Sequence, residues 1–299
     1  MRDSDTATPI LVCGLLSADV VFNVDCIPTR AIKYRADDVS VRSGGGGAYA
    51  SIAVNRLGGH ASLLARLGND HFAQLIISSL VEEGIDCTHV SSNAHMQTPI
   101  SCIAIDAHGD RQIVNYRDDA GEILSNDLLF NPLPKAVLVD TRWLAGSLYA
   151  LDYARSHDVP GVVDAEAPIA VKALHLASHI AFSRQGLSDY ASTDSIPEGL
   201  KKAQEQFSAW VCVTDGEHGT HLLQEGGVLT IPAPSIQAID SLGAGDVWHG
   251  AFCVQLARGE NEINAVRFAN YAAALKCTQS GGGWSAPVLS DVHKFLETD

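Results

Sequence analysis

The sequence predicts an α/β protein whose centre is a mainly parallel β-sheet. Short apolar runs alternate along the chain with longer segments in which apolar residues recur at helical spacing, and this alternation is typical of βαβ units. Several apolar runs end in polar or glycine-rich turns, which is where open α/β sheets bind their ligands. We find no internal repeat, low-complexity segment or linker, and we therefore expect one domain over residues 1–299.

The strands expected in the central sheet are apolar runs bounded by turn residues. They cover residues 10–16, 61–67, 136–140, 159–164, 179–183 and 210–214, and a hairpin over 222–231 turns at Gly226-Gly227. The helices expected between them cover residues 48–57, 72–83, 147–157, 247–258 and 264–276. Asp70 is expected to cap the second of these helices, with a substrate contact as the alternative, and Gly84 to end it.

Four further segments show the pattern of a second, smaller sheet. They cover residues 20–26, 36–42, 100–106 and 111–116, and the last two flank the turn His108-Gly109-Asp110. We therefore expect a small separate β-layer beside the central sheet.

The acidic composition limits the partners of the protein. Its 46% hydrophobic and 18% charged residues describe a globular chain, and its formal net charge of −15 argues against nucleic acid and anionic membranes as partners. No apolar run approaches the ~18 residues of a membrane helix, and residues 1–6 do not resemble a signal peptide. The seven cysteines show neither zinc spacing nor a Cys-x-x-Cys pair. We expect reduced cysteines and a cytoplasmic location.

The stretch most informative about function is Asp240-Ser-Leu-Gly-Ala-Gly-Asp246, directly before an expected helix. The first N–H groups of a helix have no partner within it, and the small residues Gly243, Ala244 and Gly245 leave those groups accessible to an anion. Asp246 adds a carboxylate, which would repel a phosphate unless it takes a proton from an attacking hydroxyl. The pattern therefore indicates phosphoryl transfer, with an ordinary glycine-rich turn capped by Asp as the alternative.

This stretch resembles the C-terminal signature of the PfkB/ribokinase family of sugar kinases, Asp-Thr-x-Gly-Ala-Gly-Asp, with Ser241 in place of Thr. The N-terminal signature of that family, a Gly-Gly stretch that runs into an Ala-rich helix, is similar to residues 44–57. The resemblance implies a three-layer ribokinase-like fold with a β-sheet lid, formed here by residues of about 17–43 and 98–118. It also implies transfer of the ATP γ-phosphoryl group to a sugar with Mg²⁺ as cofactor, and a homodimer formed through the lid.

The resemblance further assigns individual residues. It implies that Asp246 is the general base and that Gly243, Ala244 and Gly245 hold the transferring phosphoryl group. The sugar would contact Asp19, Gly44 and Gly45, with an ordinary turn residue as the alternative for Asp19. The residues implied for the nucleotide are Thr214, Gly216, Gly219, Asn270, Ala273 and Gly282.

Two acidic residues, Asp164 and Glu166, follow an expected strand and could hold Mg²⁺ through its waters. The alternative is a pair of solvated loop acids. Many members of the family carry Asn-x-x-Glu where this chain has Ser183-Arg-Gln-Gly186, so the usual magnesium contact is changed here.

Within the family, the chain is similar to the sulfofructose kinase branch. The similarity is carried by segments that include Lys33-Tyr, Asn115-Tyr, Asp140-Thr-Arg142-Trp and Gly245-Asp-Val-Trp-His-Gly-Ala. It implies that Lys33, Asn115 and Arg142 surround a sulfonate, and two cations with an amide donor suit an anionic head group. The sequence therefore predicts an anionic ketohexose such as 6-deoxy-6-sulfofructose. A neutral ketohexose such as fructose, or a phosphorylated one, is the alternative, since Lys33 and Arg142 could be surface charges.

Two functions of other classes remain open. A catalytically inactive sugar-binding regulator would keep the fold, but the intact Asp246 and its flanking glycines argue against it. A nicotinamide oxidoreductase is disfavoured because the chain lacks the Gly-x-Gly-x-x-Gly dinucleotide pattern.

Overall fold

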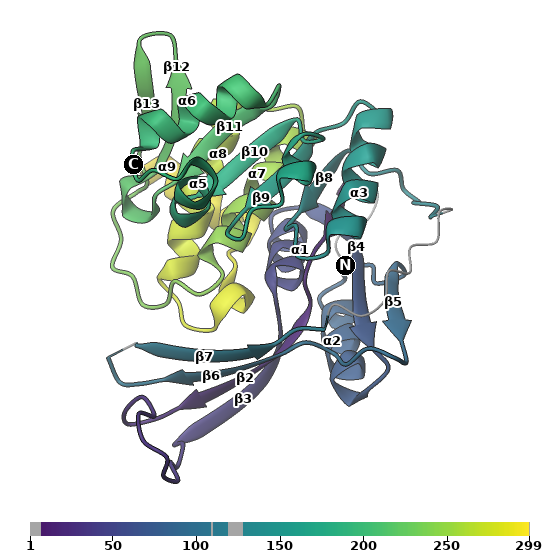
Figure 1. Ribbon diagram of the computed structural model, residues 1–299, viewed down its shortest axis with the longest axis vertical. Helices are drawn as coiled ribbons and strands as arrows, with labels where there is room; N and C mark the ends of the chain where they lie inside the picture. The colour runs from purple at the N-terminus through teal and green to yellow at the C-terminus, as the bar shows by residue number, and fades with distance from the viewer. Residues whose placement is uncertain (1–6, 109, 119–127, 299) are drawn as a thin grey trace.

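The computed structural model of the protein describes residues 7–108, 110–118 and 128–298 (Figure 1). The predictions made for residues 1–6, and for Gly109 in the hairpin turn, lie outside these ranges. Within them the chain forms a large, mainly parallel sheet with helices on both faces and a smaller second sheet, which confirms the predicted fold class.

The large sheet has nine strands within the described ranges, in the order β13-β12-β11-β10-β9-β8-β1-β4-β5. The strands from β11 to β5 run parallel to their neighbours, and β12 and β13 are added antiparallel at one edge. Their bounds are β1 Thr8–Cys13, β4 Gly59–Gly68, β5 Val90–Asn93, β8 Ala136–Val139, β9 Gly161–Ala165, β10 His179–Ser183, β11 Trp210–Thr214, β12 Thr220–Gln224 and β13 Gly227–Ile231. The carboxyl ends of the parallel strands meet at one edge, where the loops that follow them can build a single site.

Helices cover both faces because the parallel strands present apolar side chains to both sides. In β1, Ile10 and Val12 belong to one buried cluster and Leu11 and Cys13 to the other. The first cluster includes residues of α1 Gly46–Arg56, α2 His71–Glu82, α7 Ala244–Ala257, α8 Glu262–Cys277 and α9 Leu289–Thr298. The second includes residues of α3 Leu144–Ser156, α4 Val171–Leu174, α5 Arg184–Ala191 and α6 Ile196–Gln206. Two short 3₁₀ helices, η1 Gly216–His218 and η2 Gly282–Ser285, lie in loops, and none of the described helices has both the length and the apolar character needed to cross a bilayer.

The small sheet has the strand order β3-β2-β6-β7 and extends away from the large sheet as a separate layer (Figure 1). Its strands are β2 Ser17–Asn23, β3 Asp38–Gly44, β6 Ile100–Ile105 and β7 Arg111–Tyr116, and we call it the lid sheet. Only Gly14, Leu15 and Leu16 separate β1 from β2, and Gly45 alone separates β3 from α1. The lid sheet is therefore attached directly at the carboxyl edge of the large sheet.

Three local predictions change in the structure. The first central strand ends at Cys13 rather than at residue 16, so Asp19 lies within β2 of the lid sheet and not at the end of a central strand. Helix α7 begins at Ala244 rather than at residue 247, which places Asp246 in its first turn. Strand β5 and helices α5, α6 and α9 were not predicted, although apolar residues recur at helical spacing in these three helices. The predicted cap is confirmed, since the Asp70 carboxylate accepts the amide hydrogen of Ala73.

Candidate active site

The first turn of α7 has the geometry of an anion site. Gly243 precedes it with a φ of 76°, a left-handed conformation that glycine adopts without strain. A Cβ on Gly243 would lie 2.8 Å from the amide nitrogen of Gly283, so the close approach of these two loops also requires glycine. Within the described part of the chain, no acceptor pairs with the amides of Gly245 and Asp246, whereas the amide of Val247 binds the carbonyl of Gly243. Two donors therefore point out at the positive end of the helix.

Asp246 lies in the same turn and faces the start of α1. A Cβ built on Gly46 would lie 2.9 Å from its Oδ1, so only glycine leaves room for this carboxylate. Burial, followed by repulsion from Asp164, raises the pKa of Asp246 to about 7, although His249 acts in the opposite direction. A carboxylate with a pKa near neutrality is suited to act as a general base on a hydroxyl.

Asp140 was not singled out by the sequence, yet it lines a small cavity together with Asp246 and Asp164. Its carboxylate accepts the amide hydrogen of Leu15 at 2.6 Å and that of Arg142 at 2.9 Å. Asp140 therefore ties the loop after β1 to the loop after β8. Its place at the end of a strand was the signal that could have identified it.

His249 is a second residue that the sequence did not identify. Its Nδ1 lies 2.7 Å from the carbonyl oxygen of Gly245 and its Nε2 lies 3.3 Å from that of Ala181, and both carbonyls can only accept a hydrogen bond from the ring. Its Nε2 lies 3.5 Å from Oδ1 of Asp164. Burial lowers the pKa of His249, while burial and the neighbouring Glu166 raise the pKa of Asp164 well above its usual range. His249 thus joins the anion-binding turn to the acidic residues that follow β9.

Of the residues predicted for Mg²⁺, Asp164 is the penultimate residue of strand β9 and Glu166 directly follows the strand. Glu166 is ion-paired with Arg142, and within the described residues no group of three or more His, Cys, Asp and Glu side chains is arranged around a metal position. Magnesium commonly binds one or two carboxylates and completes its shell with substrate phosphates and water. Two neighbouring carboxylates, one of them already paired with an arginine, fit an ion held mainly by a nucleotide.

A larger cavity of about 610 Å³ also reaches the start of α7, where Ala244 and Gly245 line it. This volume lies within the range of about 300–1,000 Å³ that is usual for ligand pockets. Five residues predicted for the nucleotide lie in its lining: Thr214, Gly216, Gly219, Asn270 and Ala273. Trp248 and His218 line it as well and were not predicted. The structure therefore brings the predicted nucleotide residues together at the anion-binding turn.

The sixth predicted nucleotide residue, Gly282, is not part of that lining; its amide donates to the Asp240 carboxylate at 2.9 Å. Asn270 is also engaged by the protein itself. Its Oδ1 accepts hydrogen bonds from Thr220 at 2.8 Å and from Nε1 of Trp248 at 2.7 Å. These two hydrogen bonds therefore fix the position of Asn270 in the wall of the cavity.

The residues predicted for the sugar meet where the lid sheet joins α1. Asp19 is buried and accepts hydrogen bonds from the hydroxyls of Ser17 at 2.8 Å and Tyr49 at 2.9 Å. A Cβ on Gly44 would lie 1.9 Å from Oδ2 of Asp19, and Gly45 has a φ of 89°, so both positions require glycine. Burial and the charge of Asp19 raise the pKa of Tyr49, which keeps its hydroxyl a donor. Tyr49 was not predicted, because an aromatic residue in an Ala-rich helix is more often a core residue.

Lys33, Asn115 and Arg142 do not line a common cavity in the structure. Lys33 is exposed in the loop between β2 and β3, and Asn115 is exposed on β7. Arg142 instead lines a third cavity with Arg66 and Arg117, beside the loop that follows β1. Three arginines therefore meet at one cavity, and of these Arg66 was not assigned a role from the sequence.

Comparisons with known proteins agree with this geometry. A sequence model described as "pfkB family carbohydrate kinase" matches residues 7–289. The chain is 25% identical to a ribokinase of Bacillus subtilis (strain 168), over 96% of this chain and 99% of the relative. It is 25% identical to fructokinase-1 of Oryza sativa subsp. japonica, over 92% of this chain and 95% of the relative. A crystal structure of a ribokinase from Thermotoga maritima superposes with a TM-score of 0.82 at 25% identity, covering 97% of this chain and 99% of that one.

Proposed function

Because the chain belongs to the pfkB family of carbohydrate kinases and is therefore an ATP-dependent sugar kinase, we propose that its acceptor is an anionic ketohexose such as 6-deoxy-6-sulfofructose. The observation that carries the proposal is the cavity lined jointly by Arg66, Arg117 and Arg142. In a chain of net charge −15, three arginines against the single carboxylate of Asp118 in the same lining create a local site for an anion. Arginine also matches the geometry of sulfonate and phosphate oxygens better than lysine does.

The proposed reaction is centred on Asp246. Its carboxylate takes the proton of the attacking sugar hydroxyl while the oxygen bonds to the γ-phosphorus and the bond to ADP breaks. The amides of Gly245 and Asp246 stabilise the charge that spreads over the transferring oxygens. Bound Mg²⁺ would neutralise the nucleotide phosphates beside Asp164 and Glu166. The nucleotide would occupy the cavity of about 610 Å³, since that cavity ends at the same turn.

The side chain of Arg142 is held in a fixed position. It is 14% exposed, donates to the carbonyl oxygen of Ala167 at 3.0 Å and is ion-paired with Glu166. A guanidinium has five N–H donors, so Arg142 can keep these partners and still bind a ligand oxygen. The roles proposed for Lys33 and Asn115 require these exposed residues to meet the same head group when sugar binds.

The proposal is tested by measuring ADP release with 6-deoxy-6-sulfofructose, fructose, fructose 6-phosphate and tagatose 6-phosphate, without nicotinamide. We expect the highest kcat/KM with sulfofructose. A preference for fructose would assign a neutral ketohexose, and a preference for either phosphosugar would assign a phosphate as the head group. Binding of ATP and of these sugars without turnover would support the inactive regulator instead.

We further propose that the protein is a cytoplasmic homodimer formed through the lid sheet. Apolar side chains are exposed on both edge strands of that sheet, among them Val39 at 54% and Val114 at 68% exposure. Contiguous exposed apolar residues often mark a contact with another chain. Light scattering after gel filtration is expected to give twice the mass of 31.7 kDa, and Val114→Asp is expected to give the monomer mass.

A further inference from the structure

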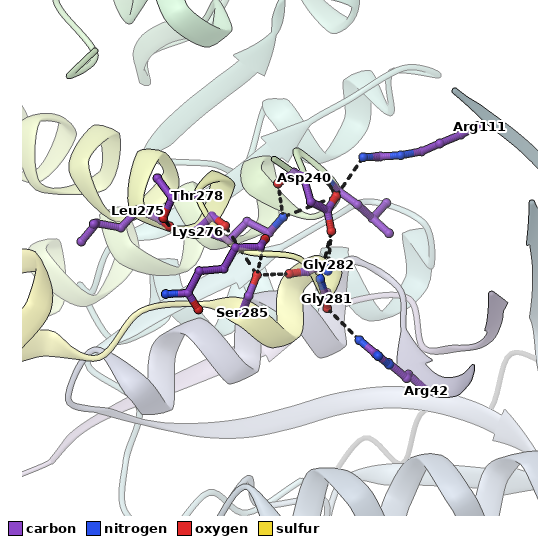
Figure 2. A network of polar contacts seen from close by, with 11 residues as sticks. Arg42, Arg111, Asp240, Leu275, Lys276, Thr278, Gly281, Gly282 and Ser285 are labelled. Atoms are coloured by element: carbon purple, nitrogen blue, oxygen red, sulfur yellow. Dashed lines mark hydrogen bonds and ion pairs between the residues drawn. The ribbon is translucent and has the colours of Figure 1, made fainter. Parts of the chain in front are cut away.

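The carboxylate of Asp240 connects three separate parts of the molecule (Figure 2). Its Oδ2 accepts the amide hydrogens of Gly281 at 3.1 Å and Gly282 at 2.9 Å, in the loop after α8. Its Oδ1 accepts the amide hydrogen of Leu242 at 2.9 Å, in the loop that leads into α7. Arg111, the first residue of β7 in the lid sheet, donates to the same Oδ1 at 2.8 Å. One carboxylate therefore holds the loop before the anion-binding turn, the loop after α8 and the lid sheet.

Lys276 fixes Asp240 from the interior of the protein. Its side chain is fully buried, and its Nζ lies 2.6 Å from the main-chain carbonyl oxygen of Asp240 and 3.8 Å from its Oδ1. Burial by itself would raise the pKa of Asp240, but the amides of Gly282 and Leu242 and the charges of Lys276 and Arg111 lower it below its usual range. The carboxylate is thus ionised, with one fixed cation from the core and a second cation from the lid.

The lid sheet reaches these loops from both of its edges. Arg111 starts the edge strand β7, and Arg42 lies in the opposite edge strand β3, where it donates to the carbonyl oxygen of Gly281 at 3.4 Å (Figure 2). The side chains of Arg111 and Asp240 are 24% and 16% exposed, so their ion pair is partly removed from water. Pairs of this kind contribute more than fully exposed ones, because water and salt screen them less.

We propose that Arg111 is a positioning residue that transmits the docked state of the lid sheet to the anion-binding turn through Asp240. With the lid docked, Arg111 holds the Oδ1 that also binds the amide of Leu242, and Leu242 directly precedes the turn of Gly243 to Gly245. With the lid lifted, Asp240 keeps Lys276 and the glycine amides but loses this constraint on the loop before α7. The anion-binding turn is then fully ordered only when the lid sheet covers the sugar. This coupling favours transfer of the phosphoryl group to the sugar over its transfer to water. This inference rests on the proposed function in one respect, that the lid sheet covers the sugar.

The first test needs no sugar and no turnover. Amide hydrogen exchange is measured over residues 240–247 in Arg111→Ala, in Arg111→Lys and in Gln112→Ala, the last being an exposed neighbour on the same strand. We expect faster exchange at these amides in Arg111→Ala, partial recovery in Arg111→Lys and no change in Gln112→Ala. Unchanged exchange in Arg111→Ala would overturn the proposal whatever the substrate is, so a wrong sugar assignment cannot be mistaken for its failure.

The second test separates positioning of the turn from attachment of the lid. With fructose and with 6-deoxy-6-sulfofructose as acceptors, Arg111→Ala is expected to lower kcat at least about tenfold, and Arg111→Lys to restore part of it. A rise in the KM for sugar with unchanged kcat would show that Arg111 merely fastens the lid, and would contradict the proposal. Thermal unfolding of the same variants is expected to fall only slightly below that of Gln112→Ala, because Asp240 keeps Lys276 and the amides of Leu242, Gly281 and Gly282 when Arg111 is removed.

Discussion

A Cβ placed on Gly46, the first residue of α1, would lie 2.9 Å from Oδ1 of Asp246 in the first turn of α7 and 3.1 Å from Oδ2 of Asp140. Two helices from distant parts of the chain therefore begin against the same carboxylates. Their positive ends offset part of the cost of keeping several acidic groups together. The arrangement depends on the absence of a side chain at a single glycine.

We predict that Gly46→Ala lowers kcat at least about tenfold, because the added methyl group displaces the Asp246 carboxylate by a few tenths of an ångström and reaction geometry is sensitive to such shifts. Steady-state kinetics measures the effect, and circular dichroism checks that the helices are retained. A variant that folds normally and keeps its full kcat would show that Asp246 does not need this position.

We predict that Asp246→Asn lowers kcat at least ~10²-fold, since the amide cannot take the proton of the attacking hydroxyl. Equilibrium binding of ATP and of sugar should remain close to that of the unsubstituted protein, because Asn keeps the shape of the side chain. Turnover within a few-fold of the original value would remove Asp246 from the role of general base.

The pH dependence follows from the raised pKa of Asp246. Burial and Asp164 raise this pKa to about 7, and only the ionised form can accept a proton. We therefore predict that kcat/KM rises with pH, is half-maximal near pH 7 and levels off about one pH unit higher. The residual activity of Asp246→Asn is expected to lack this rise, and an identical rise in that variant would assign it to another group.

The same pKa predicts the sign of a stability change. The folded protein holds the Asp246 proton more tightly than the unfolded chain, whose Asp groups titrate near pH 3.9. The free energy of unfolding contributed by this group is therefore lost as the pH rises from about 4 through about 7. Asp246→Asn should gain stability relative to the original protein above pH ~7 and show little difference near pH ~4 in urea denaturation. The opposite order of stabilities at high pH would contradict the burial argument.

Arg142→Ala is predicted to raise the KM for sulfofructose at least about tenfold more than the KM for fructose, because only the anionic sugar loses a charged partner. Arg155→Ala, which removes an exposed arginine from the last turn of α3, serves as the matched control. Equal effects on both sugars would show that Arg142 supports the loop structure and does not select the head group.

Gly245→Ala is predicted to weaken nucleotide binding while leaving the stability of the fold nearly unchanged. A Cβ at Gly245 would meet no protein atom within 4 Å, so thermal unfolding should be nearly unchanged. The same residue lines the cavity proposed for the nucleotide, where the methyl group would occupy space needed by the phosphates. Isothermal titration with ADP should therefore show weaker binding, and unaltered binding would place the phosphates elsewhere.

Local sequence patterns were sufficient to predict the α/β class, most central strands and the glycine-rich start of α7. These features depend on apolar periodicity and on backbone conformations that few residues tolerate, and both are properties of short segments. The cap by Asp70 and the turn at Gly226 belong to the same group, because their partners lie within a few residues.

Contacts between distant segments were decided by the tertiary structure alone. Nothing near Asp140 in the sequence shows that it binds Leu15, and nothing near Asp240 shows that its partners are Arg111 and Lys276. Helices α5 and α9 are a different case, because apolar residues recur along both at helical spacing and the sequence did carry a signal for them.

The sequence by itself thus determined the kind of chemistry, through an anion-binding helix start with an adjacent carboxylate in Gly243 to Asp246. Only the tertiary structure decided the surroundings of that carboxylate: the burial that raises its pKa, the cavity lined by three arginines, and the link from the lid sheet to Asp240. The physical reason is that hydrogen-bond donors at a helix start are fixed by local backbone geometry, whereas burial and charge pairing depend on which distant segments the fold brings together.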